Sequence, residues 1–146
     1  MRLILDTNIL LSALLSPLGA PAKLLDAWER KVFTLVACEA LIVELRDVAG
    51  RPSFRTRLRA SAAELLAAGI RDFSFFCRDL PSDSIAPNPK DSYLLALGEA
   101  SEAEFLVTGD KELLSLTQHK STRIITPVAM IELLKEAGSG EQRKDK

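Results

Sequence analysis

The stretch that decides the fold opens the chain: Arg2-Leu3-Ile4-Leu5-Asp6-Thr7-Asn8-Ile9-Leu10-Leu11-Ser12-Ala13-Leu14-Leu15. Its first part predicts a short buried strand at residues 3–5, and its second part predicts a helix from Thr7 to about Leu15. One carboxylate, Asp6, lies at the junction between them. A charged side chain is costly inside either buried element unless it is paired or bound to a cation. Asp6 is therefore the first candidate site residue.

The rest of the chain alternates strands with helices. Short β-branched or aromatic runs predict further strands at residues 32–37, 75–77, 105–108 and 123–126. Helical composition predicts helices at residues 20–30, 38–45, 61–73, 92–103, 111–116 and 127–135. The spacing of Ser61 and Glu64 predicts a capping box at the start of the helix at 61–73. This alternation predicts a three-layer α/β/α sandwich around a central parallel sheet of four to five strands. In such sheets, functional sites form at the carboxyl ends of the strands.

Length and composition predict one domain. A chain of 146 residues is long enough to bury a core without disulfides or structural zinc. Its 47% hydrophobic and 27% charged residues are ordinary for a soluble globular protein. We expect a single domain over residues 1–137 and a disordered tail over residues 138–146.

The charge balance excludes nucleic-acid binding through overall positive charge. Nineteen Lys and Arg against twenty Asp and Glu leave a formal net charge of -1. Any contact with a nucleic acid must therefore come from a local patch. One segment is basic enough, and it contains Arg46, Arg51, Arg55, Arg57 and Arg59. These arginines are either solvated helix faces or contacts to phosphate, for which Arg is well suited.

Cysteine and histidine offer little chemistry here. Cys38 and Cys77 lack zinc-motif spacing, and we expect both to be reduced thiols in the core of an intracellular protein. His119 is the only histidine, and we expect it in a surface loop, which argues against a zinc site or a histidine general base. Residues 2–22 loosely imitate a secretory signal, but Asp6 and Asn8 interrupt the apolar run, so we expect a cytoplasmic protein.

Three further acids lie at positions comparable to that of Asp6. Glu44 lies within a broadly apolar helix, Asp91 begins a helix after a long loop, and Asp110 follows the strand at 105–108. Four converging carboxylates would repel one another unless a divalent cation neutralised them, and oxygen ligands favour magnesium or manganese. Each acid also has a simpler interpretation: the aspartates as helix N-caps and Glu44 as part of a solvated helix face. Spacing alone does not decide between these.

The order of six motifs resembles that of PIN-domain nucleases, in particular the group regarded as toxins of toxin–antitoxin systems. The resemblance covers about residues 1 to 136. The motifs are Leu3-Ile4-Leu5-Asp6-Thr7-Asn8, the helix bearing Glu44, Arg51-Pro52-Ser53-Phe54, Asn88-Pro89-Lys90-Asp91-Ser92-Tyr93-Leu94-Leu95-Ala96, Leu106-Val107-Thr108-Gly109-Asp110 and Ile125-Thr126-Pro127.

The resemblance implies a function and partners. It implies a metal-dependent endoribonuclease that hydrolyses the phosphodiester bonds of single-stranded RNA with Mg²⁺ or Mn²⁺, as the toxin component of a type II toxin–antitoxin system. It further implies a small antitoxin protein as a partner, and a homodimer. The alternative is a catalytically silent PIN-fold binding protein that acts through a protein partner.

The resemblance also assigns roles to individual residues. It implies a catalytic quartet of Asp6, Glu44, Asp91 and Asp110. The expected metal ligands are Asp6, Asp91 and Asp110. The expected supporting residues are Thr7, Asn8 and Thr108. The candidates for RNA binding are Arg51, Arg55, Arg57 and Arg59. The chain departs from the family where relatives often carry further acids or a Lys, at Asn88, Lys90, Ser92 and Ser53.

Overall fold

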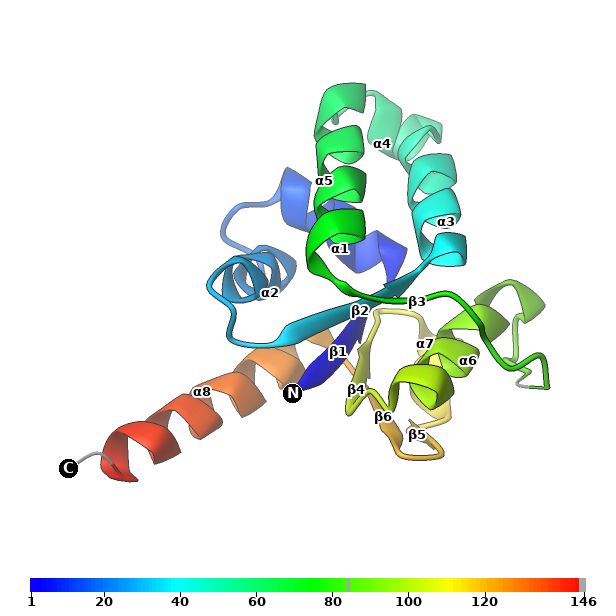
Figure 1. Cartoon of the computed structure of the whole chain (residues 1–146). Helices are drawn as coiled ribbons and strands as arrows, with labels where there is room; N and C mark the ends of the chain where they lie inside the picture. Colours follow the sequence, from blue (N-terminus) through cyan, green and yellow to red (C-terminus); the bar gives the residue numbers. More distant parts are fainter. Residues whose placement is uncertain (84, 145–146) are drawn as a thin grey trace.

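The computed structural model describes residues 1–83 and 85–144, with side chains described as far as residue 138 (Figure 1). The first half of the chain forms β1 (Arg2–Leu5), α1 (Thr7–Leu15), α2 (Ala20–Glu29), β2 (Thr34–Cys38), α3 (Glu39–Ala49), α4 (Pro52–Arg55) and α5 (Ala60–Phe73). The second half forms β3 (Phe75–Cys77), the 3₁₀ helix η1 (Pro89–Asp91), α6 (Ser92–Ser101), β4 (Phe105–Val107), α7 (Lys111–Ser115), β5 (Gln118–His119), β6 (Thr122–Ile125) and α8 (Pro127–Lys144).

The predicted fold class is confirmed: a mostly parallel sheet lies between helices. The strand order is β3-β2-β1-β4-β6-β5, and all neighbours pair in parallel except β5 and β6. Figure 1 shows α2 and α8 on one side of the sheet and α6 on the other. The sheet has six strands instead of the expected four to five, because the short antiparallel β5 extends its edge.

The two central strands carry the core. Leu3, Ile4 and Leu5 of β1 are at most 1% exposed, and all three residues of β4 are buried. This is the continuous apolar pattern of parallel strands covered on both faces. On one of these faces α6 lies very close to β6, since a Cβ at Gly98 would lie 2.7 Å from the Thr122 hydroxyl oxygen. Glycine at this position therefore permits the close approach of the helix that follows Asp91.

The first two helices are apolar and packed into the molecule. Five of the nine residues of α1 are buried, and α2 buries Leu24 and Ala27 against the core. Among the residues described, no single helix is long and apolar enough to cross a membrane, whereas α1 and α2 meet that test together as a pair bent by 97°.

The expectation that His119 lies in a loop is wrong. His119 belongs to β5 and pairs with Thr122 across a tight hairpin, in which Lys120 has a positive φ of 51°. Its ring nitrogen lies 3.3 Å from a carboxylate oxygen of Glu99 on α6, and Lys120 contacts the same carboxylate. The hairpin was missed because two residues are too few to show the alternation of a strand.

Two predictions about helix ends are also corrected. Ser61 and Glu64 do not form a capping box, because α5 begins at Ala60 and Glu64 instead pairs with Arg46 at 3.1 Å. The last helix does not end at Lys135: the helical backbone of α8 continues to Lys144, through part of the predicted disordered tail. Glycine weakens a helix interior by about 1 kcal/mol but does not stop it as proline does. Residues 145–146 of that tail lie outside the described residues.

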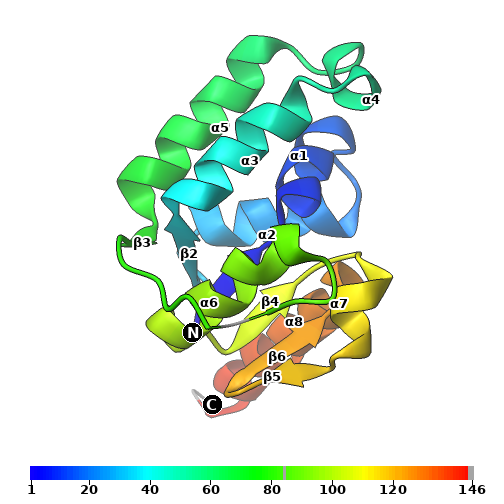
Figure 2. The same cartoon turned by 90° about the vertical axis from the view of Figure 1, so that its right-hand side faces the viewer.

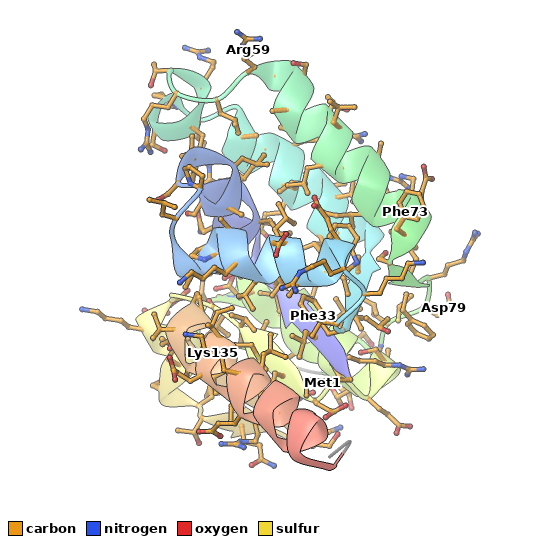
Figure 3. The ribbon with its side chains drawn as sticks, turned by 90° about the vertical axis from the view of Figure 1, so that its left-hand side faces the viewer. Met1, Phe33, Arg59, Phe73, Asp79 and Lys135 are labelled. Atoms are coloured by element: carbon orange, nitrogen blue, oxygen red, sulfur yellow. The ribbon has the colours of Figure 1, made fainter. Side chains whose placement is uncertain are left out.

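An apolar hollow of about 830 Å³ lies between α2, α5 and the start of β2, with Trp28, Phe33, Leu65 and Phe73 in its lining. Figure 3 shows Phe33 and Phe73 on this side of the molecule. Leu65 and Phe73 are 74% and 77% exposed. None of the four candidate acids lines this hollow, so it is not the predicted site.

Candidate active site

The register of β1 against β4 places Asp6 beside Thr108. Leu5 pairs with Val107, and the Asp6 amide continues the ladder by donating to the Val107 carbonyl at 3.0 Å. The Thr108 hydroxyl then donates to Asp6 Oδ2 at 2.8 Å. Asp6 is only 6% exposed, and this burial raises the pKa of its carboxyl although the Thr108 hydrogen bond opposes the shift. Asp6 holds the N-cap position of α1, yet its side chain does not cap the helix.

Thr108 also connects Asp6 to Asp110. The Thr108 oxygen accepts a hydrogen bond from the Asp110 amide at 3.0 Å, so one buried hydroxyl serves both strand ends. Asp110 Oδ1 accepts from the Glu112 amide at 2.8 Å and therefore caps α7. The capping interpretation is correct for Asp110, and it occupies one of the two carboxylate oxygens.

Glu44 faces the same region and is not part of a solvated helix face. The Thr7 hydroxyl lies 3.4 Å from Glu44 Oε1 and 3.4 Å from Asp6 Oδ1, so it stands between the two acids. The Tyr93 hydroxyl donates to Glu44 Oε2 at 2.5 Å. Both oxygens of Glu44 thus contact hydroxyl groups, one from α1 and one from α6.

Asp91 completes the group of four acids. It ends η1, precedes α6 and is half-buried, and its side chain does not cap the helix. Burial, the charges of Asp6, Asp110 and Glu44, and a hydrogen bond with Asp110 together raise the pKa of Asp91 to about 6. The four acids therefore lie close enough to act on one another, at the carboxyl ends of β1 and β4. Figure 2 shows two of the helices concerned, α3, which carries Glu44, and α6, which follows Asp91.

Of the three expected supporting residues, two join this network. Thr7 and Thr108 are fully buried and contact the acids. Asn8 is exposed in the first turn of α1, and no hydrogen bond of its side chain is found among the residues described. Its predicted role has no support in this geometry.

The four candidate arginines lie around α4, at the end of the α3–α5 pair that points away from the sheet (Figure 1). Arg51 pairs with Asp47 at 3.0 Å, and Arg57 donates to the Ser53 carbonyl at 2.9 Å. The side chains of Arg55 and Arg59 are exposed and form no hydrogen bond or ion pair within residues 1–83 and 85–138. These last two are the arginines that are free to bind an anion.

Comparison with known proteins identifies the family. A protein-family model described as the PIN domain matches residues 2–112, which include all four acids. The chain belongs to the PIN-domain family. A search of curated proteins found no match. PIN domains are generally nucleases and typically bind divalent metals.

The acids of this PIN domain fit a divalent cation by charge and by donor type. None of the ion pairs in the described part of the chain involves Asp6, Glu44, Asp91 or Asp110. Their negative charge is thus not balanced by Lys or Arg, and oxygen-only donors suit Mg²⁺ or Mn²⁺. Among the described residues, no group of three or more Asp, Glu, His or Cys is arranged to hold a metal ion. Magnesium commonly takes only one or two carboxylates and keeps several waters, so such a group is not required. The three-ligand set stays a prediction.

Sequence reasoning missed Tyr93 in this PIN domain. Tyr93 occupies an apolar position of α6, and helical spacing alone predicts that such a position faces the core. Burial raises its pKa, and so does its hydrogen bond to Glu44, because that bond requires the protonated hydroxyl. The only signal in the sequence was a hydroxyl-bearing side chain two residues after a candidate acid.

Replacing Asp91 with Asn is expected to stabilise the metal-free PIN domain at pH 7.5. The folded-state pKa of Asp91, about 6, lies above the ordinary aspartate value of 3.8. The stability that this group contributes is therefore complete below pH 3.8 and is lost as the pH rises through 6. Asn carries no charge to repel the other acids. In chelator, the thermal midpoint of the variant should exceed that of the wild type by a few degrees at pH 7.5 and match it near pH 4.

Asp72→Asn, at an exposed position on α5, is the control, and an equal gain in that variant would contradict the assignment.

Proposed function

We propose that this PIN domain is a divalent-metal-dependent endoribonuclease that hydrolyses phosphodiester bonds of single-stranded RNA. One observation supports the proposal most strongly: the hydroxyls of Thr7 and Thr108 connect Asp6 to Glu44 and Asp110, and burial together with the charges of these three acids raises the pKa of Asp91 to about 6. A protein that gathers uncompensated carboxylates loses stability unless a cation binds there. Family membership supplies the nuclease class, and the substrate comes from the resemblance of the motifs.

In the proposed mechanism, Asp6 and Asp110, together with Asp91, hold Mg²⁺ or Mn²⁺. A divalent ion held by these acids would supply Lewis-acid chemistry, which would polarise a phosphate oxygen and activate a water for attack. Glu44 accepts a hydrogen bond from the attacking water and so orients it in line with the bond to be broken. Thr108 fixes Asp6 by its 2.8 Å hydrogen bond, and Thr7 contacts both Asp6 and Glu44. These hydroxyls restrict the rotation of the acids and prepare the site for the ion.

A cleavage assay tests this proposal. Single-stranded RNA is incubated with the wild-type chain in Mg²⁺, in Mn²⁺ and in excess chelator, and the products are separated on a denaturing gel. We expect internal cleavage with either metal and none with chelator. Cleavage that persists in chelator, or no cleavage with either metal, would contradict the proposal.

The free arginines are expected to contribute most to RNA binding. Arg55→Ala and Arg59→Ala should each weaken RNA affinity and make its dependence on salt shallower, because each removes a contact to phosphate. Arg51→Ala and Arg57→Ala should have smaller effects, since these side chains already bind Asp47 and the Ser53 carbonyl. Fluorescence anisotropy at several salt concentrations measures both quantities. If the affinity and the salt slope stay unchanged in Arg55→Ala and Arg59→Ala, the patch has no role in RNA binding.

We also propose that the chain acts as a toxin, neutralised by a small antitoxin protein, and that it forms a homodimer in the cytoplasm. Cellular expression tests the toxin role. The wild type should arrest growth, and Asp6→Asn should not. Unaffected growth on expression of folded wild-type protein would contradict it.

A second candidate function is a catalytically silent PIN-fold binding protein that acts through a protein partner. It is favoured by the lack, among the described residues, of a three-ligand group arranged for a metal ion. Metal titration separates the two candidates. The nuclease requires a divalent ion to bind at the acids, whereas the silent protein would show no binding at physiological magnesium concentration.

A further inference from the structure

Tyr93 is the only tyrosine of the chain, and its hydroxyl enters the acid group. It is the second residue of α6, and its ring packs against the edge of the core. The Tyr93 hydroxyl donates to Glu44 Oε2 at 2.5 Å. Buried tyrosines usually find a hydrogen-bond partner, so the bond alone does not assign a role. The choice of acceptor is what matters here.

The acceptor is held from two sides. Glu44 Oε2 accepts from Tyr93 on α6, and Glu44 Oε1 lies 3.4 Å from the Thr7 hydroxyl on α1. Glu44 itself lies on α3, so its carboxylate joins three helices. A glutamate side chain has three rotatable bonds, and a single contact leaves its carboxylate free to turn. Two donors on different helices fix the direction in which both oxygens point.

These two contacts direct the Glu44 carboxylate toward Asp6. Thr7 lies 3.4 Å from Asp6 Oδ1 as well as from Glu44 Oε1, and the charge of Glu44 raises the pKa of Asp6. Because the Thr7 contacts are long, the short Tyr93 bond is the stronger of the two constraints on Glu44. Among the described residues, the Tyr93 hydroxyl is the one group of α6 with a hydrogen bond to the Glu44 carboxylate.

We infer that Tyr93 is a positioning residue, whose hydroxyl acts through Glu44 by holding its carboxylate toward Asp6. The effect of this contact on RNA cleavage rests on the proposed function, but the contact itself does not. The inference therefore has two separate tests, one in the absence of metal and one on the active protein.

The first test is a double-mutant cycle of stability in chelator. Tyr93→Phe removes only the hydroxyl and should lower the urea midpoint of the wild type. In a Glu44→Ala background the same change should raise the midpoint. In that background the Tyr93 hydroxyl has no acceptor, so replacing tyrosine with phenylalanine removes a buried donor without a partner. Ser101→Ala is the matched control: Ser101 is also buried on α6 and donates to the Leu97 carbonyl at 2.7 Å, away from the acids. Its effect should be the same in both backgrounds.

The second test measures RNA cleavage by the same variants with Mg²⁺. Tyr93→Phe should lower kcat about 10–100-fold, the usual effect of losing a residue that orients a site carboxylate, and should leave KM nearly unchanged. In the Glu44→Ala background it should cause no further loss. Ser101→Ala should leave kcat unchanged.

The outcomes separate the inference from the proposed function. Equal effects of Tyr93→Phe on the urea midpoint in both backgrounds would show that the two side chains are not coupled, and would overturn the inference. A coupled midpoint with a kcat like that of Ser101→Ala would reduce Tyr93 to a stabilising residue, and would also overturn it. If the wild type cleaves no RNA in either metal, the proposed function fails, and the stability cycle still decides whether Tyr93 holds Glu44.

Discussion

Asp6→Asn is expected to lower metal-dependent RNA cleavage by more than about 100-fold, beyond the effect of losing a residue that only supports a ligand. Asp6 is 6% exposed, lies at the end of the central strand β1 and accepts the Thr108 hydrogen bond at 2.8 Å. Asn keeps the shape and can still accept that bond, but it removes the negative charge that attracts the ion. The fold should survive, because the change relieves repulsion between Asp6 and Glu44. Gel assays of cleavage and circular dichroism measure the two results.

Asp26→Asn is the matched control for this experiment. Asp26 lies on α2, is exposed and pairs only with Arg30 in the described part of the chain, and exposed pairs contribute little. Its cleavage rate should equal that of the wild type. Wild-type cleavage by folded Asp6→Asn would remove Asp6 from the mechanism and would refute the site as a whole.

Thr108→Val has the second largest expected effect. The change keeps the size of the fully buried Thr108 side chain but removes the donor to Asp6 and the acceptor for the Asp110 amide. Leaving these buried groups unpaired should cost about 1–3 kcal/mol of unfolding free energy. Cleavage should fall about 10–100-fold, because Asp6 loses the contact that fixes its orientation. Urea denaturation and cleavage rates measure the two effects.

Thr108→Ser separates the hydroxyl from the packing of the methyl group. The serine hydroxyl can make both hydrogen bonds, so cleavage should stay within a few-fold of the wild type, although the lost methyl group lowers stability. If Thr108→Ser is as inactive as Thr108→Val, the methyl packing and not the hydroxyl holds the site together.

The fold was predictable because its signals are local. The apolar runs of β1 and β4 and the helices between them follow from composition and spacing, and the alternation of strands and helices leaves few possible arrangements. The edge hairpin was not predictable, because Gln118 and His119 can be assigned to a strand only once their pairing with β6 is known. The predicted capping box failed for a similar reason, since Arg46 on a different helix pairs with Glu64.

The candidate site was predictable in part. Asp6 and Asp110 follow from their positions after central strands, and the structure places the hydroxyl of Thr108 between them. Glu44 could not be separated from a solvated helix residue by spacing, because the contacts that hold it come from Thr7 and Tyr93 on other helices. The position of Tyr93 predicts a core residue. Helical spacing does not distinguish a ring that only packs on the core from a ring whose hydroxyl also contacts a site residue.

The most direct test of the central claim is the location of a divalent ion in a crystal of the wild-type chain grown with Mn²⁺. An anomalous difference map identifies manganese without assumptions about its ligands. The account predicts a manganese peak in contact with the carboxylate of Asp6, Asp91 or Asp110, at the carboxyl ends of β1 and β4. A map with no peak at these acids under saturating Mn²⁺, or with manganese bound only elsewhere, would contradict it.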